Sequence, residues 1–119
     1  MSITCGVDFG TSNSTVGCFQ AGTVKLLELE DAKPTLPSII FFNTDLAETS
    51  FGRAALNAYL EGYEGRLMRS MKSLLGTSLI EGHTEVHGRR IGYKELLCEY
   101  LGELKRRAEQ TAGNSFESA

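Results

Sequence analysis

The fold is decided by the stretch Gly6-Val7-Asp8-Phe9-Gly10-Thr11-Ser12-Asn13-Ser14, near the start of a chain of 119 residues. Apolar residues alternate with small or polar ones over residues 3–9, and an apolar run resumes over residues 15–19. Runs of this kind are typical of β-strands. Between them stands Gly-Thr-Ser-Asn, whose members tolerate unusual backbone angles or hydrogen-bond their own main chain. The pattern therefore predicts two antiparallel strands joined by a tight turn.

The turn has the residue types that a phosphate group requires. Gly10 lets the backbone approach an anion closely, and the hydroxyls of Thr11 and Ser12 add donors to the amides of a possible anion-binding nest. Asn13 continues this row of side chains that can form hydrogen bonds. Asp8 would repel a phosphate, so we expect it to hold a hydrated Mg²⁺ that bridges to the phosphate oxygens. The alternative is a polar hairpin turn with a capping aspartate.

Composition predicts an ordinary globular domain and argues against some partners. Hydrophobic residues make up 41% and charged residues 23% of the chain, and the net charge is −3. We expect no nucleic-acid partner, because binding to a phosphate backbone needs a basic surface. We also expect no membrane partner, because no apolar run approaches the ~20 residues that span a bilayer. The amino-terminal residues lack the pattern of a signal peptide. Cys5, Cys18 and Cys98 are predicted to be buried thiols in a reducing cytoplasm.

Further strands follow from β-type patterns and turn residues. A third strand is predicted over residues 23–29, which would complete an antiparallel meander, and a buried strand over residues 39–42. Residues 43–50 are predicted to form a polar loop, and residues 77–90 a flexible connection or a weak hairpin. No element is predicted for residues 113–119.

Three stretches have helical periodicity: residues 54–60, residues 66–75 and residues 93–112. The second has a charged side at threefold spacing, formed by Arg66, Arg69 and Lys72. The third is long enough to cover one side of the meander, and Glu103 precedes Arg107 by four residues on its polar face, a stabilising order. Its apolar face is predicted to carry Leu96, Leu97, Tyr100, Leu101, Leu104 and Ala108.

A second possible site for a ligand is His83-Thr84-Glu85-Val86-His87, which places two histidines and a glutamate within five residues. On a helix, the two histidines would share a face and could chelate a metal ion. The flanking glycines, Gly82 and Gly88, argue against a helix, and the spacing differs from the metalloprotease pattern His-Glu-x-x-His. Metal binding is therefore the less favoured interpretation of this segment.

Four segments resemble the Hsp70 branch of the actin, sugar kinase and Hsp70 superfamily. Residues 7–14 are similar to its first phosphate loop, Asp-x-Gly-Thr-(Thr/Ser) after a hydrophobic strand. Thr35-Leu36-Pro37-Ser38 is similar to its Thr-x-Pro-Ser segment, and Phe51-Gly52-Arg53-Ala54-Ala55 to the start of its next helix. Met71-Lys72-Ser73-Leu74-Leu75-Gly76 resembles the segment that carries the family's active-site lysine. The order and approximate spacing agree over nearly the whole chain, and the shorter bacterial relatives of the YegD type are the nearest in this resemblance.

The resemblance implies a mixed α/β fold, part of one lobe of a ribonuclease H-like, actin-like ATPase. An antiparallel meander packed by a long carboxy-terminal helix would form a partial base subdomain from residues 1–42 and 92–119. Residues 43–91 would form a small upper subdomain of helical character. The chain would then be the amino-terminal portion of an Hsp70-like chaperone ATPase.

The same resemblance implies ATP or ADP with Mg²⁺ as the ligand. Gly10, Thr11, Ser12 and Asn13 would bind the phosphates, and Asp8 would reach the metal through water. Lys72 would be the catalytic lysine, near the terminal phosphate, where an ammonium offsets developing charge and orients the attacking water. From the charge pattern alone, Lys72 is instead a solvated lysine in the stripe that begins at Arg66.

The family's second phosphate loop, Asp-x-Gly-Gly-Gly-Thr, is missing, since the sequence contains no Gly-Gly pair. We therefore expect this chain by itself to bind nucleotide weakly and to hydrolyse it poorly, because half of the clamp lacks the opposing donors. Unfolded polypeptide clients and co-chaperones would bind through domains beyond these residues. Two alternatives stay open: a small-molecule or sugar kinase of the same superfamily, and a non-catalytic interaction module.

Overall fold

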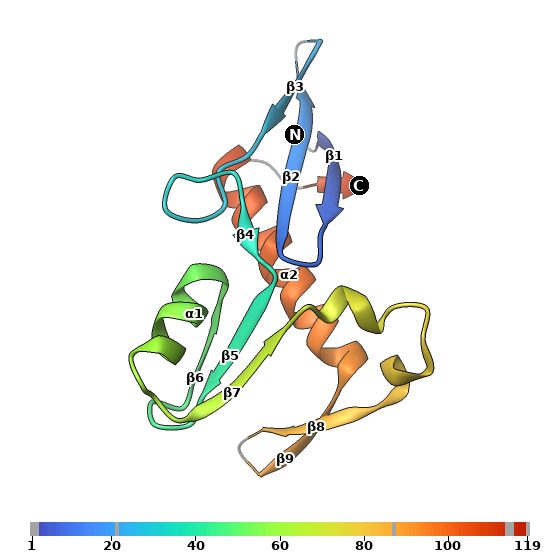
Figure 1. The fold of residues 1–119 in the computed structure, drawn as a ribbon. Coiled ribbons are helices and arrows are strands. Elements are labelled where there is room, and N and C mark those ends of the chain that lie inside the picture. Colours follow the sequence, from blue (N-terminus) through green and yellow to red (C-terminus); the bar gives the residue numbers. More distant parts are fainter. Residues whose placement is uncertain (1–2, 21, 87, 114–115, 119) are drawn as a thin grey trace.

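The amino-terminal residues form the predicted antiparallel meander. The computed structural model describes residues 3–20, 22–86, 88–113 and 116–118. Strand β1 (Ile3–Phe9) pairs with β2 (Asn13–Gln20), and β2 pairs with β3 (Thr23–Leu26). Because the register sets Phe9 opposite Ser14, the turn of residues 10–13 stands at one end of this sheet (Figure 1).

Two short strands extend the sheet. Strand β4 (Leu36–Pro37) pairs antiparallel with the start of β2, directly beside the turn. Strand β10 (Phe116–Ser118) pairs in parallel with β1, so the prediction that residues 113–119 form no element is wrong. A strand this short takes its structure from the hydrogen bonds of an existing sheet edge, which no local sequence pattern reveals.

Helix α2 (Tyr93–Ala112) covers one face of the meander, as predicted (Figure 1). Leu101, which was expected on the buried face, is 39% exposed, because it lies about 100° around the helix from Tyr100. Cys98 is also exposed, so the prediction of buried thiols holds only for Cys5 and Cys18. The helix residues that enter the core are Leu96, Leu97, Tyr100, Leu104 and Ala108.

A second sheet has the predicted buried strand at its centre. Strand β5 (Ile39–Asn43) lies between β6 (Glu48–Phe51) and β7 (Gly65–Arg69), and helix α1 (Gly52–Leu60) packs on one face. Every residue of β5 is buried, because its side chains alternate between two apolar clusters. Ile39 and Phe41 pack with α1, whereas Ile40 and Phe42 join the core beneath α2. Contrary to the predicted polar loop over residues 43–50, β6 already begins at residue 48.

The predicted helix over residues 66–75 is not present. Residues 65–69 form β7 and pair with β5 along its whole length, and a 3₁₀ turn, η1 (Met71–Leu74), follows. Gly65 permits this pairing, because a Cβ atom there would collide with the carbonyl oxygen of Phe42 and lie 2.8 Å from the Phe41 ring. Hydrogen bonding to a buried strand therefore overrides a weak helical pattern.

Residues 78–92 form a 3₁₀ turn and a hairpin, which confirms the hairpin alternative for this segment. The turn is η2 (Ser78–Glu81), and strands β8 (His83–Val86) and β9 (Arg89–Gly92) pair antiparallel. Val86 and Ile91 face the main core. The mixed α/β fold class is confirmed. Neither of the two described α-helices is apolar enough over its length to cross a membrane.

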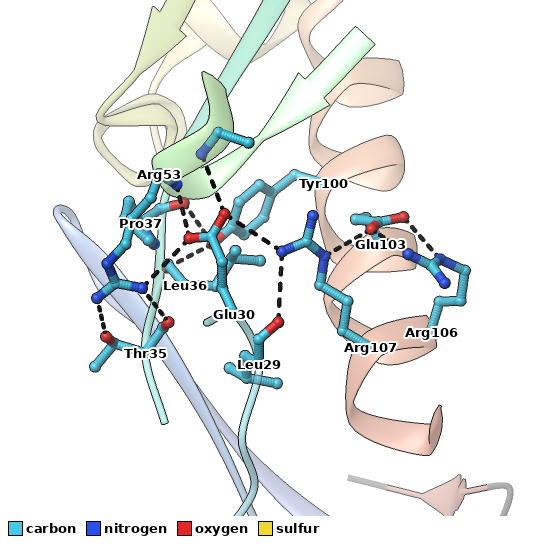
Figure 2. Close-up of polar contacts among 11 residues, drawn as sticks. Leu29, Glu30, Thr35, Leu36, Pro37, Arg53, Tyr100, Glu103, Arg106 and Arg107 are labelled. Atoms are coloured by element: carbon cyan, nitrogen blue, oxygen red, sulfur yellow. Dashed lines mark hydrogen bonds and ion pairs between the residues drawn. The ribbon is translucent and has the colours of Figure 1, made fainter. Parts of the chain in front are cut away.

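Glu30 joins three parts of the fold through one carboxylate (Figure 2). Its side chain, only 7% exposed, accepts hydrogen bonds from the backbone amides of Arg53 (2.7 Å) and Ala54 (3.1 Å) at the start of α1. The Arg53 guanidinium also contacts it at 3.3 Å, and that of Arg107 on α2 at 3.6 Å. Gly52 allows this approach, since it has φ +67° and a Cβ there would lie 2.8 Å from the carboxylate.

Candidate functional site: the β1–β2 turn

The β1–β2 hairpin brings together the residues predicted to bind phosphate. Asp8, Thr11, Ser12 and Asn13 are exposed, and Gly10 is half-buried. The Gly10 amide donates to the Asn13 carbonyl at 2.9 Å, which closes the turn. A Cβ atom on Gly10 would collide with that same carbonyl, so glycine is required for the turn to close in this way.

Ser38 fixes the orientation of two peptide groups in the turn. Its hydroxyl donates to the Gly10 carbonyl at 2.9 Å, and its backbone amide donates to the Ser12 carbonyl at 2.9 Å. In a planar trans peptide, the C=O and N–H groups point in opposite directions. The amides of Thr11 and Asn13 therefore point away from Ser38.

Three buried hydroxyl groups stand behind the turn. Ser14 Oγ lies 3.1 Å from Ser38 Oγ, and Tyr100 Oη lies 3.0 Å from Ser14 Oγ. Tyr100 is also within hydrogen-bond distance of the carbonyls of Leu36 (3.0 Å) and Pro37 (3.2 Å), as Figure 2 shows. All three hydroxyl-bearing residues are 0% exposed. Burial raises the pKa of the Tyr100 phenol, so the group keeps its proton and remains a donor at neutral pH.

Asp8 lies beside a shallow hollow on the face of the meander opposite α2. The hollow has a volume of about 480 Å³, and its floor includes Gly6 and Gly17, which stand opposite each other in the register. Thr15 pairs with Asp8 at the end nearest the turn. No set of three or more histidine, cysteine or acidic side chains among the described residues is grouped to hold a metal ion. Asp8 could thus contribute one carboxylate to a metal that is otherwise bound by water and phosphate.

Lys72 lies on a separate element from the turn. It is exposed on η1, which follows Ser70, a residue in the left-handed region with φ +57°. Its ammonium forms no ion pair with any described residue. The hairpin therefore brings together Asp8 and the turn residues, whereas a position of Lys72 beside them stays a prediction.

The proposed metal site at residues 83–87 lacks the helix that would place its histidines together. His83 is exposed on strand β8, and His87 lies outside the described residues.

The residues behind the turn, Ser14, Ser38 and Tyr100, were not predicted as part of the site. Ser38 belongs to the segment of residues 35–38, which the sequence connects with a family pattern but not with the turn. Tyr100 was assigned to the apolar face of α2. A signal was nevertheless present, because a buried tyrosine hydroxyl needs a hydrogen-bond partner that leucines cannot supply.

Comparison with known proteins agrees with the fold and with the motifs. The Hsp70 protein family matches residues 4–116. The chain is also 34% identical over 116 residues to the chaperone protein DnaK of Metamycoplasma hominis, which covers 96% of this chain. The chain spans 18% of the length of that relative. With a matched region that includes strands β2 to β9, both α-helices and the β1–β2 turn, the chain belongs to the Hsp70 family.

Proposed function

We propose that the β1–β2 turn binds the phosphates of Mg·ATP or Mg·ADP, as the first of two phosphate loops in an Hsp70-like ATPase. One observation carries this proposal: Ser38 holds the carbonyls of Gly10 and Ser12, so that the amides of Thr11 and Asn13 both point away from Ser38. Amides fixed in this way form an anion-binding nest. The exposed hydroxyls of Thr11 and Ser12 add donors at the same place.

The proposed roles of the charged residues follow from the chemistry of a metal-bound phosphate. Asp8 holds a hydrated Mg²⁺ through water, because its negative charge would repel the phosphate directly. Lys72 approaches the terminal phosphate and stabilises charge in the transition state. Since Lys72 and the turn lie on different elements, its role requires the nucleotide to reach from one element to the other.

The larger protein is proposed to be an ATP-dependent chaperone of the cytoplasm. The DnaK relative is named a chaperone, and this chain corresponds to 18% of its length. Clients and co-chaperones would bind to parts outside residues 1–119. We propose that the protein belongs to the YegD-type branch of the family. Residues 1–42 and 92–119 would form the base and residues 43–91 the upper subdomain. The strand β5 would then link the two, because it begins in the first range and is hydrogen-bonded to β6 and β7 of the second.

Titration of the chain with Mg·ADP, followed by amide NMR, tests the site. We expect the largest shifts at the Thr11 and Asn13 amides, with weak binding and a Kd on the order of 1 mM, because one loop supplies only half of the donors. Asp8→Asn should remove the dependence on Mg²⁺, whereas Asp31→Asn, in another exposed turn, should leave it unchanged. Unmoved amides at Thr11 and Asn13 would contradict the proposal.

The role of Lys72 needs a protein that contains this chain together with the second phosphate loop. Lys72→Ala should lower the rate of ATP hydrolysis by about 10²-fold or more while the affinity for Mg·ATP changes little. Arg69→Ala is a matched control, because Arg69 is an exposed cation three residues before Lys72, at the end of β7. An equal loss in both variants would show that only the local positive charge matters.

A further inference from the structure

We infer that Tyr100, on helix α2, is a positioning residue for the phosphate-binding turn, and that it acts through Ser14 and Ser38. The inference rests on the proposed function for its effect on nucleotide binding. Tyr100 is separated from Ser14 by 86 residues and from the turn by two hydroxyl groups in series. It touches neither the turn's exposed side nor any group that would meet the ligand.

The direction of the hydrogen bonds in this series is fixed by the number of protons. The Gly10 carbonyl can only accept, so the single hydroxyl proton of Ser38 must point to it. The contact between Ser38 and Ser14 at 3.1 Å then uses the proton of Ser14. The contact between Ser14 and Tyr100 at 3.0 Å in turn uses the proton of Tyr100, which Ser14 shares with the carbonyls of Leu36 at 3.0 Å and Pro37 at 3.2 Å.

Through this one-way series of hydrogen bonds, the Tyr100 hydroxyl affects the orientation of the turn. Each donor strengthens the next hydrogen bond, because a hydroxyl that accepts a bond becomes a better donor. The series ends at the Gly10 carbonyl, and the peptide that carries this carbonyl also carries the Thr11 amide. Loss of the Tyr100 hydroxyl would therefore loosen the orientation of an amide that faces the proposed ligand.

The surroundings of Tyr100 keep the series in place. Tyr100, Ser14 and Ser38 are all 0% exposed, so bulk water cannot replace a missing donor. The Phe9 ring, on β1, packs against the Tyr100 ring with the centroids 5.6 Å apart. The carbonyls of Leu36 and Pro37 lie within reach of the same phenol and hold it beside the place where β4 pairs with β2.

The carbonyl carbon of Gly10 reports on this series without any nucleotide. In Tyr100→Phe, which keeps the ring and removes the hydroxyl, we expect the Gly10 ¹³C′ resonance to move upfield, as a carbonyl does when it accepts a weaker hydrogen bond. Ser38→Ala should cause the same shift with larger size, and Tyr93→Phe, on the first turn of the same helix, should cause none. An unmoved Gly10 carbonyl in Tyr100→Phe would overturn the inference.

Binding of Mg·ADP to the full chain gives the second readout. Tyr100→Phe should weaken the affinity by about fivefold, the equivalent of one ordinary hydrogen bond of ~1 kcal/mol, and reduce the shifts at Thr11 and Asn13. If the unmodified chain binds Mg·ADP and Tyr100→Phe binds it with the same affinity, the inference is overturned. If the unmodified chain shows no response to Mg·ADP, the proposed function fails, and the Gly10 carbonyl still decides whether Tyr100 orients the turn.

A measurement on the unmodified chain covers the case in which Tyr100→Phe does not fold. The hydroxyl proton of Ser38 should exchange slowly with water and give a nuclear Overhauser contact to the turn. Rapid exchange of that proton would show that it is not held on the Gly10 carbonyl, and the inference would be wrong.

Discussion

Ser38 serves the turn with both of its polar groups, one from the side chain and one from the backbone. The hydroxyl and the amide hold alternate carbonyls, at Gly10 and Ser12, so a single buried residue determines the direction of two amides. Ser38 follows β4, whose pairing with β2 brings it beside the turn. At the scale of residues, the site therefore depends on a side chain that no ligand would touch.

The three cysteines lead to a prediction at this scale. Cys98 is exposed on α2, whereas Cys5 and Cys18 are buried opposite each other in β1 and β2. Burial raises the pKa of the Cys5 thiol, with a smaller contribution from Cys18, so little reactive thiolate forms there. Iodoacetamide at neutral pH should modify Cys98 about tenfold or more faster than either buried thiol, as followed by peptide mass spectrometry. Equal rates at Cys5 and Cys98 would contradict the packing.

The residues of the turn could be predicted from the sequence, but those behind it could not. Asp8 and Gly10 belong to one short segment, and their chemistry follows from residue type and order. Tyr100 meets Ser14 only because α2 crosses the meander, and no local pattern carries information about a contact across 86 residues. The position of Lys72 depends in the same way on how η1 is placed.

Among the elements, β5 shows why part of the second sheet escaped prediction. Its apolar run was correctly assigned to a buried strand, because β-branched and aromatic residues fill every position. Its neighbour β7 has apolar and charged residues in an order that fits a helix as well as a strand. Only the presence of an unpaired edge on β5 decides between them, and that edge is a tertiary feature.

Two glycines provide a prediction at the scale of elements. Gly65→Ala should lower the free energy of unfolding by about 1–3 kcal/mol, because the new methyl group would push β7 away from Phe42 on β5. Gly102→Ala should instead raise it by about 1 kcal/mol, since Gly102 lies on exposed α2 surface with no atom near the new methyl group. Urea unfolding of both variants measures the difference. A neutral Gly65→Ala would argue against close β5–β7 pairing.

Across the whole molecule, Glu30 links the meander's exit, the start of α1 and helix α2 (Figure 2). Glu30→Gln should destabilise the protein by about 2–3 kcal/mol, because two guanidiniums would lose a buried carboxylate. This loss of stability lies at the lower end of what breaking a buried ion pair costs, because the side chains of Arg53 and Arg107 are 26% and 19% exposed.

The control for Glu30 is Glu81→Gln. Glu81 pairs with Lys94 at 2.8 Å, but both side chains are more than half exposed, so the free energy of unfolding should change by less than about 0.5 kcal/mol. Urea unfolding compares the two variants under one condition. Similar losses in both would mean that Glu30 does not hold the parts of the fold together.

The dependence of stability on alkaline pH tests the same architecture through Tyr100. The hydroxyls of Ser14 and Ser38 and the charge of Arg107 favour the phenolate, but burial outweighs them and raises the pKa of Tyr100. Because the unfolded chain loses this proton first, at pH about 10, the contribution of Tyr100 to stability is complete below that pH and is lost as the pH rises through the folded pKa. In urea unfolding, the free energy of unfolding of Tyr100→Phe should fall less steeply above pH about 10 than that of the unmodified chain. Tyr93→Phe should keep the steeper fall. A steep fall in Tyr100→Phe would mean that the phenol does not lie buried between α2 and the turn.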